Sequence, residues 1–235
     1  MINARKKWPI GQSRLLLYRT IARTRAENRE RSLMSPRPVR TGPPPDHPLL
    51  FLQGFLKRPK EVASIIPSSR FLMRRIVRFA DVARARTIVE LGPGTGGSTR
   101  TLLRAMHPEA KLLAIEIVPQ FVSLVRATVH DPRLHVHEGS AIEIAEALGA
   151  RGLERPDLVL SGIPFSTIPR EVGLTILERV NDVLAPGGRF VAYQARDRVE
   201  VLGRQVFGKP RVQLELLNVP PMRVYRWDQP IASGA

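Results

Sequence analysis

The chain has 235 residues, of which 43% are hydrophobic and 25% are charged, enough for one globular domain with a full core and additional segments. It contains no cysteine, which excludes disulfides and thiolate metal sites, and its formal net charge is +16. No apolar run approaches the roughly 18 residues of a membrane span. No signal-peptide pattern is evident, so we expect a cytoplasmic location.

The N-terminal third of the chain carries almost all of the positive charge. Residues 1–80 contain 18 Lys and Arg against 4 Asp and Glu, a net of +14, whereas residues 81–235 have a net of +2. A basic arm attached to a near-neutral domain indicates an anionic partner, either nucleic acid or an acidic membrane surface.

The arm itself is predicted to span residues 1–48 and to be flexible. Its proline-rich stretch at residues 35–48 excludes a helix there. Residues 49–85 are predicted to form an amphipathic helical lead-in to the domain that follows. The lead-in begins with an apolar and aromatic segment at residues 49–57.

The second half of the lead-in contains a basic amphipathic helix. Ser68 or Ser69 can cap its start. One arc of the helix is apolar, and the other carries Arg70, Arg74, Arg75 and Arg78. The pattern leaves open whether these arginines lie in water or contact a membrane or phosphate groups.

Strands and helices alternate through residues 86–229, and residues 230–235 form a tail. Strands separated by helices imply parallel crossovers, and two closing strands joined by Val219-Pro220-Pro221 imply an antiparallel hairpin. We therefore predict an α/β fold with a Rossmann-like, seven-stranded sheet and helices on both faces. The predicted strands span residues 87–91, 111–116, 134–138, 157–161, 189–194, 211–218 and 222–227. The predicted helices span residues 97–106, 119–128, 141–148, 169–184 and 197–206.

A glycine-rich turn follows the first of these strands. Gly92, Gly94 and Gly97 satisfy the G-x-G-x-x-G pattern of dinucleotide sites, which has little specificity alone. Glu90 would repel a pyrophosphate but can pair with a cationic amine. Pro93 removes a backbone donor that a phosphate site uses. S-adenosylmethionine carries an ammonium and a sulfonium in place of phosphates, so the acidic loop favours it over a nicotinamide cofactor.

Two other strand ends carry candidate functional groups. Glu116 ends the second predicted strand, where a carboxylate can accept hydrogen bonds from both ribose hydroxyls. The fourth strand leads into Ser161-Gly162-Ile163-Pro164, a tight turn suited to chemistry. His135 and His137 share one face of the third strand, and we expect no acidic ligand beside them. We interpret this pair as a solvated strand edge, and we expect no metal site.

Four segments within residues 50–227 resemble a known family. Glu90-Leu91-Gly92-Pro93-Gly94-Thr95-Gly96 together with Glu116 resembles the class I S-adenosylmethionine-dependent methyltransferases. The finer resemblance is to bacterial phospholipid N-methyltransferases, which methylate phosphatidylethanolamine. It is also carried by Phe55-Leu56-Lys57-Arg58-Pro59 with Ile65-Ile66-Pro67-Ser68-Ser69, by Val159-Leu160-Ser161-Gly162-Ile163-Pro164, and by Leu217-Asn218-Val219-Pro220-Pro221-Met222-Arg223-Val224-Tyr225-Arg226.

The resemblance implies a set of site residues. Those expected to bind the cofactor are Ser68, Ser69, Glu90, Gly92, Gly94, Gly96, Glu116, Ser140, Ala141 and Ser161. The reacting amine would lie beside Ser161, Gly162 and Ile163, with Tyr193 as a wall of its pocket. A core-packed Tyr193 and a purely capping role for Ser68 and Ser69 stay open. Ser140 departs from the family, which usually has an Asp there near the adenine amine.

The implied reaction is in-line methyl transfer from the sulfonium to the primary amine of phosphatidylethanolamine or a related aminolipid. Such a transfer needs a neutral amine, alignment and exclusion of water, and no general base is evident in the sequence. The basic arm and the apolar segment at residues 49–57 would hold the protein at the anionic inner face of the cell membrane. Within that segment, Phe51, Leu52, Phe55 and Leu56 are expected to enter the interface.

Three alternatives stay open. Ribosomal RNA adenine dimethyltransferases use a similar fold with an Asn-Leu-Pro-aromatic turn; here Ser161-Gly162 replaces the Asn, although Phe165 keeps an aromatic nearby. Nucleic acid is therefore the second candidate partner. Another small molecule is a further possible methyl acceptor, besides an aminolipid and RNA. A non-catalytic adaptor is disfavoured because Glu90, the glycines and Glu116 are all present.

Overall fold

The computed structural model describes residues 69–231. The predictions for the basic arm, for the apolar segment at residues 49–57 and for Ser68 lie outside the described residues. None of the helices within residues 69–231 is long and apolar enough to cross a bilayer.

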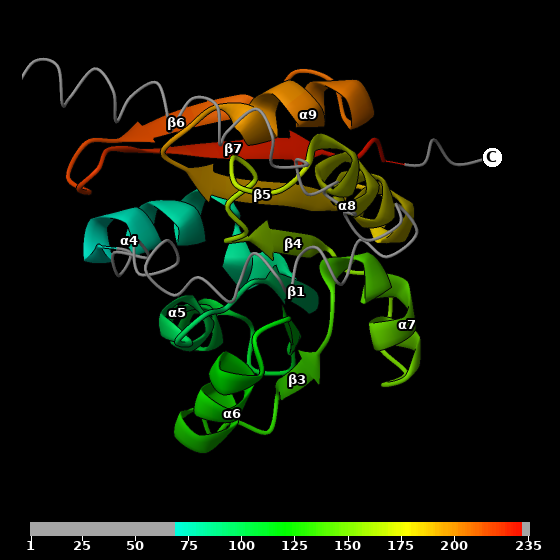
Figure 1. The fold of residues 1–235 in the computed structure, drawn as a ribbon. Helices are drawn as coiled ribbons and strands as arrows, with labels where there is room; N and C mark the ends of the chain where they lie inside the picture. Colours follow the sequence, from blue (N-terminus) through cyan, green and yellow to red (C-terminus); the bar gives the residue numbers. More distant parts are fainter. Residues whose placement is uncertain (1–68, 232–235) are drawn as a thin grey trace, which may run out of the picture. The chain divides into compact units, whose positions relative to one another are not determined.

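A seven-stranded sheet forms the centre of the described part, with the strand order β3-β2-β1-β4-β5-β7-β6 (Figure 1). β1, β2, β3, β4 and β5 pair in parallel, and β7 runs antiparallel to both β5 and β6. The strands are β1 (Thr87–Leu91), β2 (Lys111–Glu116), β3 (Leu134–Glu138), β4 (Leu158–Ser161), β5 (Arg189–Gln194), β6 (Arg211–Glu215) and β7 (Met222–Asp228). The predicted fold class is confirmed, including the antiparallel hairpin at the end of the sheet.

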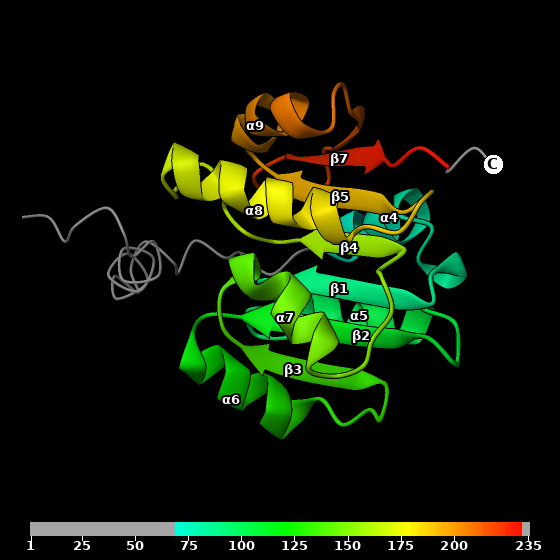
Figure 2. The same cartoon turned by 90° about the vertical axis from the view of Figure 1, so that its right-hand side faces the viewer.

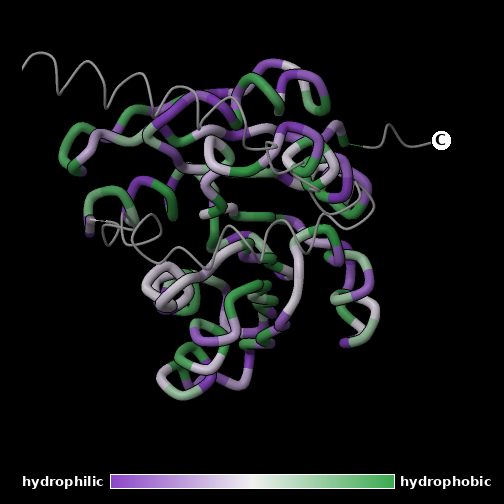
Figure 3. The backbone as a smooth tube through the Cα atoms, viewed as in Figure 1, coloured by the Kyte–Doolittle hydropathy of each residue, from purple (hydrophilic) through white to green (hydrophobic). Residues whose placement is uncertain are grey.

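Helices cover both faces of the sheet, with α4 and α5 on one face and α7, α8 and α9 on the other (Figures 1 and 2). The helices are α4 (Arg70–Phe79), α5 (Gly97–Ala105), α6 (Pro119–Thr128), α7 (Ile144–Gly149), α8 (Arg170–Val183) and α9 (Arg198–Val206). Two short 3₁₀ turns, Val82–Arg84 and Ala141–Glu143, complete the set. Figure 3 shows hydrophilic and hydrophobic residues alternating around these helices, as expected for helices with one face on a sheet.

Strand alternation sends neighbouring side chains into two separate cores. Ile88 of β1 packs with α4 and α5, whereas its neighbour Val89 packs with α7 and α8. All five residues of β1 are buried because β1 lies between β2 and β4 and is covered on both faces. Because β1 is buried in this way, the strand that leads into the glycine loop is held firmly in place.

Helix α4 is tied to the far end of the sheet by polar contacts as well as by its apolar arc. Arg75 forms an ion pair with Glu215 of β6 at 2.8 Å, and Arg226 of β7 donates to the Phe79 carbonyl at 2.6 Å. Arg189, which is buried on β5, donates to the Ala80 carbonyl at the end of the helix. The predicted basic helix is therefore confirmed, but Arg75 pairs with the sheet and does not lie free in water.

Element bounds differ from the predictions by more than one residue in two places. The predicted strand at residues 211–218 ends at Glu215, because the Leu217 amide turns back to donate to the Glu215 carboxylate at 2.9 Å. The predicted helix at residues 141–148 begins as a 3₁₀ turn, with the Ser140 hydroxyl accepting from the Ile142 amide. Both differences arise from local side-chain bonds that compete with regular structure.

Candidate active site

A cavity of about 950 Å³ opens at the carboxyl edge of the parallel strands. Its inner wall is made of the loops that follow β1, β2, β3, β4 and β5. From there the cavity extends between α4 and α5 and reaches the loop that joins β6 to β7. The carboxyl edge is where open α/β sheets bind ligands, and the volume is sufficient for a nucleoside and a second molecule.

The glycine loop after β1 folds tightly along this cavity. Gly92 and Gly94 have φ angles of +75° and +55°, a left-handed conformation that other residues adopt only at a cost. A Cβ on Gly92 would also meet the Ile163 side chain at 3.4 Å. The loop after β1 and the turn after β4 are therefore in direct contact.

Glu90 lies beneath this loop as a buried carboxylic acid. Its Oε2 accepts a hydrogen bond from the Thr99 hydroxyl at 2.6 Å. Its Oε1 is buried and has no hydrogen-bond partner among the described residues. Burial raises the pKa of Glu90 from 4.5 to about 7, and the nearby hydroxyl groups of Ser98 and Thr99 offset part of that rise. A buried oxygen with free acceptor capacity fits the ammonium of S-adenosylmethionine.

Glu116 lines the cavity at the end of β2. Its Oε2 accepts from the Gly94 amide and its Oε1 from the Val118 amide, each at 3.0 Å. Burial raises its pKa, and backbone hydrogen bonds from Val118, Gly94 and Ile117 act in the opposite direction. Each oxygen keeps a further lone pair, so this carboxylate can also accept from a vicinal pair of hydroxyls.

The turn after β4 lies between the glycine loop and β5. The buried Ser161 hydroxyl accepts from the Ile163 amide at 3.3 Å. A Cβ on Gly162 would lie 2.8 Å from the Tyr193 hydroxyl and 3.0 Å from the Gly92 carbonyl oxygen. Gln194 fixes the turn further by donating to the Ile163 carbonyl. Only glycine at position 162 lets Tyr193 approach this closely.

Seven of the predicted residues line this cavity, and four others are buried outside its lining. Those that line it are Gly92, Gly94, Glu116, Ala141, Gly162, Ile163 and Tyr193. Glu90, Gly96, Ser140 and Ser161 are buried and lie outside its lining. Ser69 caps α4 through its hydroxyl, which accepts from the Leu72 amide at 3.2 Å, and its own amide donates to the Asn218 side chain at 3.0 Å. It also lies outside the described lining.

The place of Tyr193 is compatible with both of the interpretations that the sequence left open, and its role toward an amine stays a prediction. It lines the cavity, and its ring also packs against the core on the α4 side of the sheet.

The histidine pair on β3 needs a correction. Both side chains are half-buried, not solvated, and His137 Nε2 lies 3.2 Å from Glu143 Oε2. The acidic neighbour is six residues away in sequence and comes close only because the chain turns through the 3₁₀ segment after β3. Among residues 69–231, no cluster of three or more metal-ligating side chains is present.

The sequence reasoning named the arginines of α4 as possible phosphate contacts, but it missed that arginines from three segments border one cavity. Between α4 and α5 the lining includes the apolar side chains of Met73 and Val77. Arginines border this stretch and the loop after β5, namely Arg70, Arg74, Arg78, Arg104 and Arg196. Glu116 is the single carboxylate among the described lining residues. Arg196 lies two residues after the end of the parallel strand β5, and this place was the signal in the sequence that could have indicated it.

Comparisons with known proteins match this chain to methyltransferases. The family described as Methyltransferase domain matches residues 88–188. The ornithine lipid N-methyltransferase of Singulisphaera acidiphila is 34% identical over 178 residues, which cover 75% of this chain and 93% of that protein. The ribosomal RNA small subunit methyltransferase A of Caulobacter vibrioides is 39% identical over 95 residues, but these cover 34% of that protein.

Solved structures show the same fold. The N-methyltransferase NodS from Bradyrhizobium japonicum, in complex with S-adenosyl-L-homocysteine, has a TM-score of 0.55 at 15% identity, over 79% of this chain and 100% of that chain. The methyl donor of such enzymes is S-adenosylmethionine, and the buried acceptor of Glu90 and the two-oxygen acceptor of Glu116 fit its ammonium and its ribose. The chain belongs to the S-adenosylmethionine-dependent methyltransferases.

Proposed function

We propose that this enzyme methylates the primary amine of an aminolipid, phosphatidylethanolamine or a related lipid such as ornithine lipid, at the inner face of the cell membrane. The single observation that carries the proposal is the continuous cavity that joins the glycine loop to an arginine-bordered groove. A relative whose own name is ornithine lipid N-methyltransferase supports it.

On the cofactor side, we assign Glu90 to the ammonium and Glu116 to the ribose hydroxyls. Gly92, Gly94 and Gly96 allow the backbone to approach the ligand. Ala141, with Ser140 behind it, is assigned to the adenine end, where a hydroxyl stands in place of the usual carboxylate. S-adenosylmethionine supplies an electrophilic methyl group when bound.

On the acceptor side, the chain positions the amine and excludes water. The Ser161 hydroxyl and the Ile163 carbonyl lie in the turn after β4, and Gly162 brings Tyr193 against that turn. Acceptors there can hold an amine N–H and so orient the nitrogen lone pair. No residue of this turn is assigned as a general base, so the amine proton goes to solvent.

The arginine-bordered groove is suited to the rest of an aminolipid headgroup. Arg78 and Arg104 border apolar side chains of α4 and α5 that include Val77. Guanidinium groups bind phosphate or carboxylate with paired hydrogen bonds. The phosphate of phosphatidylethanolamine and the carboxylate of ornithine lipid both lie a few bonds from the amine, so one groove can serve either lipid.

The same turn disfavours an adenine base of RNA as the acceptor. Phe165, the aromatic residue that follows Pro164, is completely buried in the core between the sheet and α8. A ring in that place has no free face on which a base can stack. The sequence likeness to ribosomal RNA methyltransferases therefore does not extend to the use of this aromatic.

The experiment is methyl transfer from labelled S-adenosylmethionine to four acceptors presented separately. These are vesicles with phosphatidylethanolamine, vesicles with ornithine lipid, vesicles of phosphatidylglycerol alone, and ribosomal RNA. Label in either aminolipid but not in the other two supports the proposal. Label in RNA and in neither aminolipid would overturn it.

A further inference from the structure

The loop between β6 and β7 displays three large apolar side chains to solvent. Leu216, Leu217 and Val219 are 66%, 65% and 77% exposed, whereas most large apolar side chains of the described part are buried. They fall within four residues of one another. Exposed apolar side chains that gather in one place mark an interaction site more often than scattered ones do.

The loop is held in this conformation by polar contacts on its inner side. The buried Asn218 accepts from the Ser69 amide at 3.0 Å and donates to the Pro220 carbonyl at 2.9 Å. The Leu217 amide donates to Glu215 at 2.9 Å, and Glu215 pairs with Arg75 of α4. Because the side chain between them turns inward, Leu217 and Val219 both project outward.

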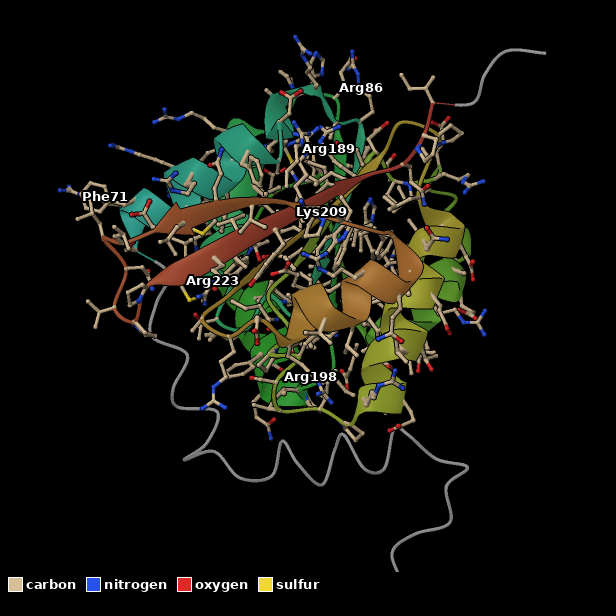
Figure 4. All side chains as sticks on the ribbon, turned by 90° about the horizontal axis from the view of Figure 1, so that it is seen from above. Phe71, Arg86, Arg189, Arg198, Lys209 and Arg223 are labelled. Atoms are coloured by element: carbon tan, nitrogen blue, oxygen red, sulfur yellow. The ribbon has the colours of Figure 1, made fainter. Side chains whose placement is uncertain are left out.

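Positive charge lies beside these apolar side chains. Arg70 and Arg74 lie exposed at the start of α4, and Arg223 lies exposed at the start of β7. None of the three has a carboxylate partner among residues 69–231. Figure 4 shows Phe71 at the outer end of α4, and Figure 1 places that end on the same side of the sheet as the β6–β7 loop. Phe71 is itself exposed, with the Arg70 guanidinium 4.9 Å from its ring centre.

The cavity reaches this loop. Asn218 and Pro220, which alternate with the exposed apolar side chains, line its wall together with Arg70. A flat surface that covered the apolar loop would therefore also lie next to one end of the cavity in which we place the lipid headgroup.

We propose that the β6–β7 loop inserts Leu216, Leu217 and Val219 into the headgroup and acyl boundary of an anionic phospholipid bilayer, while Arg70, Arg74 and Arg223 bind lipid headgroups around it. This inference rests on the proposed aminolipid function and adds a second membrane contact to the one that the sequence predicts for the N-terminal arm. An RNA surface would pair with the arginines but would leave the three apolar side chains in water.

The absence of cysteine from the sequence allows a direct test. Leu217→Cys is labelled with an environment-sensitive fluorophore, and Val201→Cys on α9, where the native valine is 51% exposed, serves as the matched control. On addition of vesicles of phosphatidylethanolamine and phosphatidylglycerol, emission from position 217 should shift to the blue and that from position 201 should not. No shift at 217, or equal shifts at both positions, would overturn the inference.

A second measurement separates insertion from attraction of charge. Leu216→Ser with Leu217→Ser should weaken binding to the same vesicles by at least about tenfold. Melting temperature and S-adenosylmethionine affinity should stay as in the unsubstituted protein. Val201→Ser should leave vesicle binding unchanged. Unchanged binding by the double variant would contradict insertion.

A third experiment tests the proposed function without a bilayer. It measures the transfer of labelled methyl groups by the unsubstituted enzyme to an aminolipid in detergent micelles. Label in micellar aminolipid with no fluorophore shift on vesicles would refute the loop inference and leave the function standing. A shift on vesicles without label in any lipid would refute the function and leave a bilayer-binding loop.

Discussion

The carboxyl group of Glu90 is buried, and its hydrogen bonding within the described residues is incomplete. One oxygen accepts from Thr99, and the other has no partner among the described residues. Leaving such an atom unpaired costs stability. Since a cation beside it would both pair with the oxygen and keep the carboxyl ionised, the arrangement is best explained as a binding site for a cationic ligand.

The raised pKa of Glu90 makes cofactor binding depend on pH. Between pH 4.5 and about 7 the folded, ligand-free protein holds a proton on Glu90 that the unfolded chain has lost. The free energy of unfolding therefore falls as pH rises through this window, by up to about 3 kcal/mol. A bound ammonium favours the ionised form, so S-adenosylmethionine should bind more tightly as pH rises through the same window and should release a proton.

Calorimetry of S-adenosylmethionine binding in buffers of different ionisation enthalpy measures both effects. Glu90→Gln should abolish the proton release and weaken binding by at least about tenfold at the upper end of the window, because a neutral amide cannot pair with the ammonium as a carboxylate does. Glu200→Gln, on the surface pair with Arg204, is the control and should behave as the unsubstituted protein does. An unchanged affinity in Glu90→Gln would mean that Glu90 does not bind the ammonium of S-adenosylmethionine.

Gly162 should be intolerant of a side chain for a steric reason. Gly162→Ala places a Cβ against the Tyr193 hydroxyl and the Gly92 carbonyl, and we expect a loss of about 1–3 kcal/mol in the free energy of unfolding. Adding Tyr193→Phe removes one of the two clashes and should restore part of the loss. Denaturant titration of the single and double variants measures this.

Gly94→Ala is the matched control for that pair. Its Cβ would meet nothing within 4 Å, so its cost arises from the φ angle of +55° alone. Tyr193→Phe should therefore give no relief to Gly94→Ala. Equal relief in both backgrounds would mean that the Gly162 contact is not the cause.

At the scale of elements, the described structure joins α4 to the β6–β7 hairpin. Ser69 and Asn218 are 149 residues apart in sequence and share a hydrogen bond, while Arg75 and Glu215 form an ion pair. These contacts position one side of the cavity, because α4 and the hairpin both contribute to its lining.

Asn218→Ala should loosen this junction. Removal of the side chain leaves the Ser69 amide and the Pro220 carbonyl without their partner, which we expect to cost about 1–3 kcal/mol. Hydrogen exchange should become faster in the first turn of α4. Gln213→Ala, which removes only a 3.4 Å bond from Arg75, is the control and should have a smaller effect. Unchanged exchange in Asn218→Ala would contradict the role of this junction.

Local sequence patterns predicted the helices and strands but not the contacts between them. Periodicity and the glycine loop predicted the strands to within a few residues, because β1 and β2 each contain an apolar run that is bounded by polar residues. The same pattern could not show that Arg104 and Arg196 border one cavity, or that Asn218 contacts Ser69. Those contacts depend on tertiary packing, which no local pattern encodes.

At the scale of the whole molecule, the described part presents a basic surface beside an apolar loop that helps to line its cavity. Binding to anionic vesicles should weaken as salt increases, since the screening length falls from about 10 Å at 0.1 M to about 3 Å at 1 M. Binding should not vanish, because the apolar contribution is not screened. Co-sedimentation over this range of salt measures the slope.

Arg70→Gln with Arg74→Gln should reduce both the affinity and its dependence on salt, by roughly fivefold in affinity for each arginine. Arg179→Gln on α8 removes an exposed positive charge from the other face of the sheet and is the control. Equal losses in both proteins would mean that net charge, and not this surface, determines binding.

The central claim is that the cavity brings the methyl donor to a lipid amine. Tandem mass spectrometry of lipids recovered after incubation with the enzyme and S-adenosylmethionine tests it most directly, because headgroup fragments locate the added methyl group. The account predicts methyl groups on the headgroup nitrogen of phosphatidylethanolamine or ornithine lipid. Aminolipids recovered without any added methyl group, alongside methylated adenine in ribosomal RNA, would contradict it.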